Sequence, residues 1–565
     1  MEAMNSFKGY GKVDPVENEH FRRKTMRRVA IVAVSTVLLI ALVVGTVVGV
    51  VVTKKNKDSR SPPPPADTVE TLCGLATYSD SCYSALSLAN TSDPQELLKF
   101  SLKSAYESLA GAQDLPGKLS AAVKNATVNS SLSDCRDLMA DALDTLNDTM
   151  LAVDDADVSQ LSLAKFDDVK TWLSSVITDR ETCLDSLLEG NDTDALEKIK
   201  SATQNFTELS SNSLAIVSKV FGAFSGKNRK LLAYESGFPR WLREEDRRIL
   251  QSINPTPDVT VASDGTGDVK TIAAAVAKIP TKSASRFVIY VKAGTYNERI
   301  DLPKSTWNLM IYGDGMGKTV ITGARSVFDG VTTYNTATFA IKGKNFIAKD
   351  ITFKNTAGAA KHQAVAFRSG SDTSVYFQCE FDAYQDTLYS HSNRQFYSYC
   401  KITGTIDFIF GNAAAVFQNC QILPRQPMAN QFNTITAQGK VDPNQNTGIS
   451  IHKSTILPNG AVAAKTYLGR PWKAFSTTVI MQTSIGAVVD ATGWTPWVTG
   501  VNPPSSIFYG EYQNTGAGSD VSKRVKWTSY FPALTINQAS KFTIGSFIDG
   551  RTWISGSAVP FSDGL

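Results

Sequence analysis

The feature that most constrains the fold is the spacing of short β-rich runs in the C-terminal part of the chain. From Asn254 onward these runs are separated by Gly, Asn and Asp, and their starts recur about every 20 to 30 residues. Representative runs are Phe287–Val291, Asn308–Tyr312, Phe346–Phe353, Val375–Phe381, Phe396–Ile402, Ala415–Ile422 and Gly448–Ile456, and only Ile272–Ile279 reads as helical. A β-sandwich would turn about every 8–12 residues. We therefore predict that residues 251–565 form a right-handed parallel β-helix.

The coil length also predicts which side chains meet. Residues one coil apart stack at roughly 4.8 Å, and Gln363, Asp386 and Asp407 are spaced for one vertical ladder. Two carboxylates about 5 Å apart cannot both ionise cheaply, so one pKa rises while the other stays low, as acid–base and nucleophilic roles require. A lone Asp is more often a loop cap, but Tyr384–Tyr389 and Asp407–Gly411 surround these two with aromatic and apolar residues.

The same stacking argument applies to the C-terminal cysteines, and either neighbouring pair of Cys379, Cys400 and Cys420 meets the spacing for a disulfide. We expect no metal site, because the histidines lack ligand spacing, and no serine hydrolase, because GxSxG is absent. The histidines are His20, His362, His391 and His452.

The N-terminal region predicts a membrane anchor. Residues 29–52 contain no charge and are long enough to cross a bilayer, whereas a buried core helix would lack the flanking basic clusters. The basic excess precedes the apolar run, so residues 1–28 are expected to stay cytoplasmic and the rest to be translocated. Residues 53–67 form a linker with the stiff SPPPP sequence at Ser61–Pro65.

Residues 68–228 read as helices with short polar loops, which favours an all-α bundle. Pairing near neighbours, Cys73 with Cys82 and Cys135 with Cys183, is the simplest of three connectivities. All six N-x-S/T acceptors fall here, consistent with the secretory pathway. They are Asn90, Asn125, Asn129, Asn147, Asn191 and Asn205.

Residues 229–250 form a polar connector with RKLL at Arg229–Leu232 and RRIL at Arg247–Leu250. Dibasic pairs between two folded units are protease sites or simply a solvated linker. Residues 68–228 carry a net charge of −12 and residues 251–565 one of +9, within a chain of +4. Opposite charges favour docking of the bundle onto the β-helix, and a basic β-helix suits a polyanionic substrate.

Five motifs in the C-terminal part, in the same order, resemble the plant pectin methylesterase family. They are Gly294–Glu298, Gln363–Arg368, Tyr384–Tyr389, Asp407–Gly411 and Leu468–Trp472, with further agreement at Asn433–Gly439. The cysteine layout and helical pattern of residues 68–228 resemble the pectin methylesterase inhibitor domain, a four-helix bundle. In such proenzymes the basic tetrads between the two parts are read as processing sites, which favours cleavage here.

The resemblance implies a role for each site residue. Asp407 looks like the nucleophile, Asp386 like the general acid and then base, and Gln385 and Gln363 like donors to the oxyanion. Arg470 would pair with Asp407, Trp472 would offer a face to a sugar ring, and Thr333 and Tyr334 would contribute at an outer subsite. The family favours a Cys400–Cys420 disulfide with Cys379 a buried thiol, and it implies no cofactor.

The resemblance further implies that the partners are methyl-esterified homogalacturonan, the chain's own pro-domain, separate inhibitor proteins, a processing protease and the membrane, but not nucleic acid. The mature enzyme is expected in the cell wall. A polygalacturonase or pectate lyase is the alternative enzyme, but it needs a different acid cluster or a calcium site. A regulatory protein whose bundle inhibits other esterases is the alternative from a different class.

Overall fold

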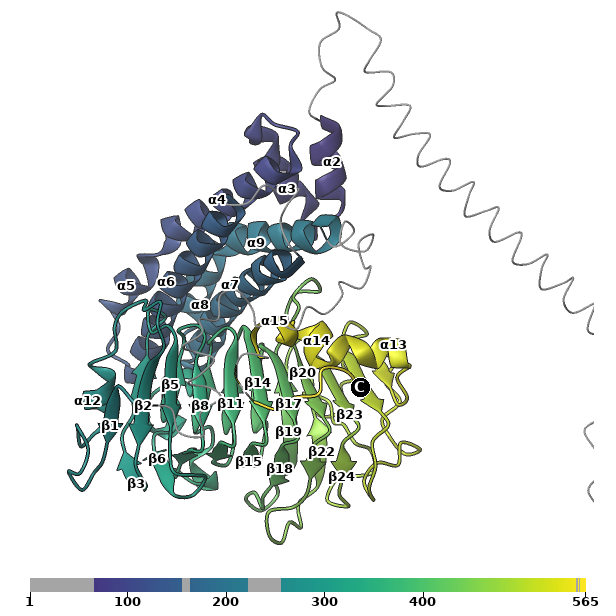
Figure 1. The fold of residues 1–565 in the computed structure, drawn as a ribbon. Helices are drawn as coiled ribbons and strands as arrows, with labels where there is room; N and C mark the ends of the chain where they lie inside the picture. The colour runs from purple at the N-terminus through teal and green to yellow at the C-terminus, as the bar shows by residue number, and fades with distance from the viewer. Residues whose placement is uncertain (1–65, 155–162, 222–255, 555–556, 558) are drawn as a thin grey trace, which may run out of the picture. The chain divides into compact units, whose positions relative to one another are not determined.

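The computed structural model describes residues 66–154, 163–221, 256–554, 557 and 559–565 (Figure 1). The predicted anchor at residues 29–52, nearly all of the linker 53–67 and the processing segment 229–250 lie outside the described residues. Within the described ranges, no helix has both the length and the apolar character needed to cross a membrane.

The first described region is helical, as predicted, and its four longest helices pack in a ring. Helix α6 packs on α7, α7 on α9, α9 on α4 and α4 on α6, which is the arrangement of a four-helix bundle. The helices are α2 (Ala66–Gly74), α3 (Ser79–Leu86), α4 (Pro94–Ala112), α5 (Leu115–Ser120), α6 (Ala126–Asp154), α7 (Leu163–Glu189), α8 (Thr193–Ala202) and α9 (Gln204–Ile216). Asp93 caps α4 by accepting from the first free backbone N–H groups.

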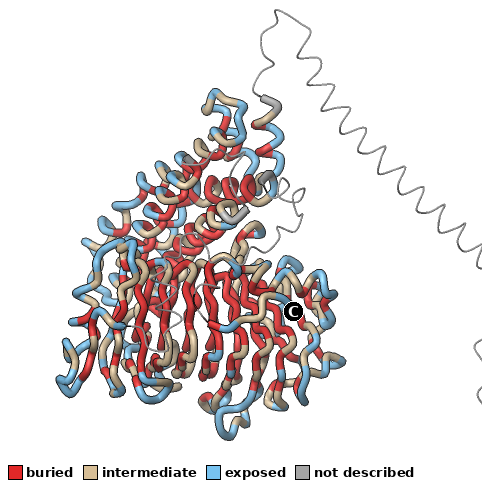
Figure 2. The backbone as a smooth tube through the Cα atoms, in the orientation of Figure 1, coloured by how far each residue is buried: buried red, intermediate tan, exposed pale blue. Residues whose placement is uncertain are grey.

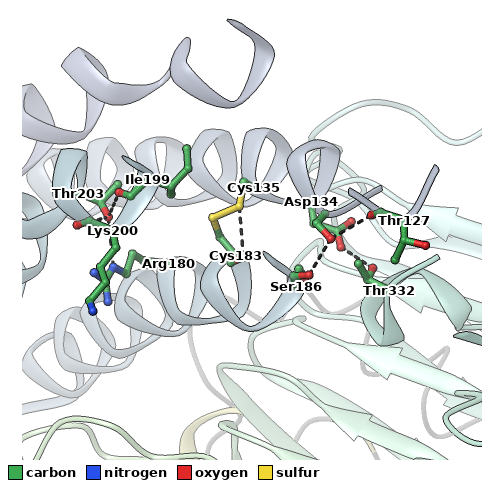
Figure 3. Close-up of a disulfide and its surroundings, with 11 residues drawn as sticks. Thr127, Asp134, Cys135, Arg180, Cys183, Ser186, Ile199, Lys200, Thr203 and Thr332 are labelled. Carbon is green, nitrogen blue, oxygen red and sulfur yellow. Dashed lines mark hydrogen bonds between the residues drawn. A yellow bond between two sulfur atoms is a disulfide. The ribbon is translucent and has the colours of Figure 1, made fainter. Parts of the chain in front are cut away.

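Two disulfides close this region, and they confirm the predicted pairing of near neighbours. Cys73 bonds to Cys82, joining α2 to α3, and Cys135 bonds to Cys183, joining α6 to α7 (Figure 3). The second bond brings the two Cα atoms to 4.4 Å and fixes the closest helix pair of the bundle.

The second region confirms the predicted parallel β-helix. Every strand pair is parallel, and each coil contributes strands to up to three sheets, because successive neighbours in a sheet are about three strands apart in sequence. The seven-stranded sheet, called here the site sheet, contains β4 (Ile300–Leu302), β7 (Phe339–Ile341), β10 (Phe367–Ser369), β13 (Leu388–Ser390), β16 (Ile409–Gly411), β19 (Asn433–Gln438) and β22 (Thr466–Gly469).

The other two sheets complete the coil. The eleven-stranded sheet contains β1 (Val259–Val261), β2 (Phe287–Val291), β5 (Leu309–Tyr312), β8 (Ile347–Lys349), β11 (Ser374–Phe377), β14 (Arg394–Ser398), β17 (Ala414–Gln418), β20 (Gly448–His452), β23 (Thr477–Met481), β25 (Phe508–Tyr512) and β26 (Tyr530–Phe531). The eight-stranded sheet contains β3 (Gly294–Asn297), β6 (Thr319–Gly323), β9 (Thr352–Asn355), β12 (Glu380–Asp382), β15 (Lys401–Gly404), β18 (Gln421–Pro424), β21 (Thr455–Ile456) and β24 (Ser484–Ile485).

Short helices flank the strands. They are α12 (Ile272–Val276), which is shorter than the predicted helical stretch, and α13 (Ile536–Ala539), α14 (Ile544–Phe547) and α15 (Gly550–Trp553) near the C-terminus.

Five of the predicted β-rich runs are each two strands separated by a sharp turn. The turn residues are not glycine, yet all adopt the left-handed conformation with φ between 50° and 56°. They are Asp350, Gln378, Tyr399, Asn419 and Lys453. One residue in this conformation redirects the chain from the eleven-stranded to the eight-stranded sheet, and its recurrence in successive coils keeps the columns aligned.

The strands of the solenoid are buried along most of their length (Figure 2). Their inward side chains form columns of like residues. The rings of Tyr376, Tyr397 and Phe417 stack at 4.4 and 4.5 Å in one such column. The three C-terminal cysteines form another column, as predicted, but Cys400 and Cys420 are free thiols rather than the expected disulfide. Each sulfur donates to a backbone carbonyl, of Tyr376 and Tyr397 respectively, and the Cys400 thiol also interacts with the thiols of Cys379 and Cys420.

The two disulfides should differ in their effect on bundle stability. Replacing both Cys135 and Cys183 by Ser should lower the free energy of unfolding of the bundle by about 4 kcal/mol, because the bond closes a long loop. Replacing Cys73 and Cys82 serves as the matched control and should cost about 2.5 kcal/mol for its 9-residue separation. Denaturant unfolding followed by helical circular dichroism measures both, and equal losses would contradict this ordering.

Candidate active site

The outer face of the site sheet carries a row of residues in register. Arg368, Tyr389, Phe410 and Ala437 are direct neighbours on β10, β13, β16 and β19. The rings of Tyr389 and Phe410 stack at 4.2 Å. The intervening positions point into the coil, so the strand alternation gives this sheet one apolar inner face and one aromatic outer face. The outer row forms the floor on which the candidate site lies.

The two predicted aspartates lie one coil apart at the edge of this floor. Leu388 pairs with Ile409 in register, and Asp386 and Asp407 each precede these residues by two positions. Both aspartates adopt the left-handed conformation, with φ of 62° and 50°, and both are buried. Adjacent coils are about 4.8 Å apart, so the carboxylates face neighbouring rungs, as the coil periodicity predicts.

Asp407 is held as a carboxylate by two strong partners. The Nε–H group of Arg470 donates to Oδ1 at 2.8 Å and its Nη2 group to Oδ2 at 2.5 Å, the two-point contact that favours an ionised acid. The hydroxyl of Thr434 donates to Oδ1 at 2.6 Å while accepting from the Asp407 backbone N–H at 2.8 Å. The Arg470 guanidinium also lies 4.2 Å from the ring centre of Trp497.

Asp386 has the opposite environment. Burial, the charge of Asp407 and the charge of Glu189 together raise the pKa of Asp386 well above its usual value, with Arg470 opposing them. Two identical side chains therefore have different environments: Arg470 and Thr434 donate to Asp407, whereas burial and neighbouring acids favour the neutral form of Asp386. This is the division that an acid–base step next to a nucleophilic step needs.

The remaining predicted residues surround this pair. Gln363 pairs in parallel register with Gln385 rather than with Asp386, so the predicted single ladder of Gln363, Asp386 and Asp407 is wrong for Gln363. Both glutamines still lie on coils adjacent to or shared with the aspartates, because Gln385 directly precedes Asp386. The ring of Trp472 lies 6.2 Å from Phe410 and 6.3 Å from Trp497, along the floor. In the described residues, no cluster of three or more His, Cys, Asp or Glu side chains has the arrangement of a metal site.

Thr333 and Tyr334 lie on a short 3₁₀ helix, Thr333–Thr336, over the floor. The guanidinium of Arg368 lies 3.5 Å from the ring centre of Tyr334, and that ring meets Tyr389 edge-on. Thr333 contacts the bundle, since its backbone N–H donates to the Glu189 carboxylate at 2.7 Å.

Two residues of the site were missed from the sequence. Thr434 follows Asp407 by a coil longer than the preceding one, so counting a fixed period does not reach it. Trp497 lies in a loop after the last strand of the site sheet. Its aromatic side chain was the only feature of the sequence that could have indicated a place in the site.

Helix α7 of the bundle lies against the site. Lys473, next to Trp472, pairs with Glu181 at 2.8 Å and Asp185 at 2.5 Å, and Thr182 lies 2.9 Å from His391. Burial raises the pKa of Asp185 to about 6, and it raises the pKa of Glu189, at the end of the helix, to about 7.

Helix α6 makes a second set of contacts. The Asp134 carboxylate accepts from the Thr332 hydroxyl at 2.5 Å (Figure 3). It also accepts from the side-chain amide of Asn335. Burial raises the pKa of Asp134 to about 6. Further along α6, Asp141 pairs with Lys342 at 2.6 Å. The acidic bundle therefore contacts basic and polar groups on both sides of Asp386 and Asp407.

Comparison with known proteins assigns both regions. Residues 258–551 match the Pectinesterase family and residues 67–216 match the Plant invertase/pectin methylesterase inhibitor family. The curated protein Pectinesterase 1 of Arabidopsis thaliana is 54% identical over 99% of this chain and 99% of its own length. The chain belongs to the pectinesterase family. It is a carboxylic ester hydrolase with an inhibitor-type helical domain.

Other relatives agree with this assignment. Pectinesterase 3 of Phaseolus vulgaris is 51% identical over the whole of both chains. The solved pectin methylesterase from carrot is 52% identical, with a TM-score of 0.54, and covers 56% of this pectinesterase and 100% of its own chain. The match thus uses the whole carrot chain but 56% of this one, a share close in size to residues 251–565.

The two aspartates should respond oppositely to the same substitution. A raised pKa in the folded state means that Asp386 favours folding below about pH 4 and loses that contribution as the pH rises through its folded pKa. Asp386→Asn should therefore raise the free energy of unfolding at pH 7, with no gain at pH 4.

Asp407→Asn is the matched variant and should lower the free energy of unfolding by about 3 kcal/mol at pH 7, because Arg470 loses its carboxylate partner. Urea unfolding of the intact chain at both pH values measures each effect. Destabilisation by Asp386→Asn at pH 7 would contradict the assigned protonation states.

Proposed function

We propose that this pectinesterase hydrolyses the methyl esters of cell-wall homogalacturonan to methanol and pectate through a covalent acyl-enzyme. The observation that carries the proposal is the contrast between Asp407, held by Arg470, and Asp386, whose pKa is raised, on neighbouring coils. Ester chemistry fits this pair better than glycosidic cleavage does, because the two glutamines beside it supply donors for a tetrahedral oxyanion.

In the proposed mechanism, the Asp407 carboxylate attacks the C6 carbonyl of a methyl-galacturonate unit. The side-chain amides of Gln363 and Gln385 donate to the oxyanion, and Asp386 gives its proton to the departing methanol. The now ionised Asp386 takes a proton from water, whose oxygen attacks the acyl-enzyme and releases the galacturonate carboxylate and Asp407. Arg470 keeps Asp407 ionised and oriented in both steps, and Trp472 offers a flat face to a sugar ring.

Methanol release from methylated pectin by residues 251–565 tests the reaction. Asp407→Ala and Asp386→Ala should each lower kcat by about a thousandfold or more, because each removes a group that changes bonds in the reaction. Asp520→Ala, in an exposed turn, is the control and should keep full activity. An active Asp407→Ala variant would refute the nucleophile, and new reducing ends would indicate a hydrolase of the glycosidic bond.

We further propose that the chain is made as an autoinhibited proenzyme, released by cleavage within residues 229–250. The support is that α6 and α7 contact residues on both sides of the aspartates and that Glu189 raises the pKa of Asp386. The buried carboxylates of the bundle have raised pKa values, so docking is favoured at low pH and weakens as the pH rises through about 6 to 7.

The intact chain should therefore release methanol at least about tenfold more slowly than residues 251–565. In the intact chain, Glu181→Gln with Asp185→Asn should restore part of the rate, because Lys473 loses both partners. Asp194→Asn with Glu197→Gln removes the same charge from the exposed face of α8 and should leave inhibition unchanged. Equal rates of the intact chain and the fragment would rule out autoinhibition.

The route to the cell wall is also a proposal. Residues 29–52 would anchor the precursor in the secretory membrane, and the sequence pattern alone supports this. All six N-x-S/T asparagines are exposed on the bundle, as glycan attachment requires. They are Asn90, Asn125, Asn129, Asn147, Asn191 and Asn205.

A further inference from the structure

A group of lysines lies along the site sheet, away from the catalytic pair. Lys304 follows β4, and Lys342 and Lys344 follow β7; these three are called here the lysine cluster. Strand β7 is two coils and β4 three coils from β13 in the sheet order, so the cluster lies about 10–14 Å along the axis from the coil of Asp386. The lysines come after their strands, whereas Asp386 and Asp407 come before theirs, so the two groups lie at opposite edges of the site sheet. A polymer bound at the aspartates therefore reaches the cluster by crossing the site sheet obliquely.

Trp307 holds the cluster in place. Its indole N–H donates to the Lys304 carbonyl at 3.0 Å, which fixes the ring against that turn. The ammonium group of Lys344 lies 3.8 Å from the ring centre, and that of Lys282 lies 5.5 Å from it. A cation over an indole face keeps its charge at a defined position while its other side faces solvent.

Two of the three lysines, Lys304 and Lys342, have partners on the bundle. Lys342 pairs with the Asp141 side chain at 2.6 Å, and Lys304 donates to the Asp141 carbonyl at 2.5 Å and to the Thr145 hydroxyl. In the described part of residues 256–565, no carboxylate forms an ion pair with any of the three lysines. When the bundle leaves, none of the three lysines keeps an ion-pair partner among these residues, and the nearest remaining carboxylates, of Asp301 and Asp372, are themselves paired with Arg368 and Arg394.

The bundle does not use the whole cluster. A cavity of about 330 Å³ remains between the two regions, lined by all three lysines and Trp307, and by Asp148 and Trp172 of the bundle. Lys344 is exposed and has no ion pair within the described residues. A surface built only to dock the bundle would not need Lys344, whereas a site for a polyanion would.

We propose that the lysine cluster binds the carboxylates of unesterified galacturonate units in the same pectin chain whose methylated part lies at Asp386 and Asp407. In the precursor, the Asp141 side chain stands where a substrate carboxylate would bind. A methyl-esterified unit is neutral, so these charges do not increase its binding affinity. The cluster therefore favours pectin chains in which unesterified galacturonate units lie near the ester that is to be hydrolysed. The inference rests on the proposed pectin substrate and adds a charge-reading site to it.

Calorimetric binding of an unesterified oligogalacturonate to residues 251–565 tests the inference. Lys304→Gln with Lys342→Gln should weaken binding by about tenfold or more, because two charge contacts are lost. Lys523→Gln with Lys526→Gln removes the same charge from an exposed turn and should leave the affinity within about twofold. Lys344→Gln should also weaken binding. Because the Lys344 side chain is exposed and has no ion pair with the bundle, this loss would not reflect a folding defect.

Kinetics give an independent readout. The Lys304→Gln, Lys342→Gln variant should show a raised KM on partly de-esterified pectin but unchanged kcat, and unchanged KM on a fully methyl-esterified oligomer. Equal calorimetric affinity of this variant, Lys344→Gln and the control would overturn the inference and leave the cluster as a docking surface for the bundle. Binding needs no turnover, so a fragment that binds normally but releases no methanol would count against the proposed reaction alone.

Discussion

The in-register stacking of successive coils is the constraint on which the rest of the structure depends. Because side chains alternate between the two faces of a strand, a slip of one residue would move Tyr389 and Phe410 into the core and Leu388 and Ile409 out of it. The left-handed turn residue in successive coils prevents such a slip. Asp386 and Asp407 adopt the same conformation and are held opposite each other by the same register, so the geometry of the site is a property of the solenoid.

The chemical difference between the aspartates comes from their neighbours rather than from their positions. Arg470 and Thr434 both donate to Asp407, whereas burial and two nearby acids act on Asp386. One of those acids, Glu189, belongs to the bundle. Docking therefore raises the free-energy cost of ionising Asp386, the state that it reaches in the proposed mechanism after methanol leaves. The bundle would oppose the second half of the reaction electrostatically as well as by covering the floor.

The sequence predicted the features that depend on coil period and on the order of elements along the chain. It did not predict the features that depend on the local conformation of single residues. The spacing of Asp386 and Asp407 was enough to put them on adjacent coils, and the nearest-neighbour disulfides followed from helix order. The turns at non-glycine residues have no compositional mark, so the division of a β-rich run into two strands was not predicted. The coil period correctly stacked Cys379, Cys400 and Cys420, but the expected bond between Cys400 and Cys420 is absent, because spacing brings thiols together without deciding whether they are oxidised.

The opposite net charges of the two regions produce a specific ion pair at the lysine cluster. A net −12 over residues 68–228 and +9 over residues 251–565 would produce only weak, screened attraction if the charges were spread evenly. Instead, Asp141 meets Lys342 in a half-buried contact beside Lys304. If the substrate uses those lysines too, bundle and pectate compete for one set of charges. Any polyuronide rich in free acid then favours the undocked state, because a ligand that binds one state shifts the equilibrium toward it.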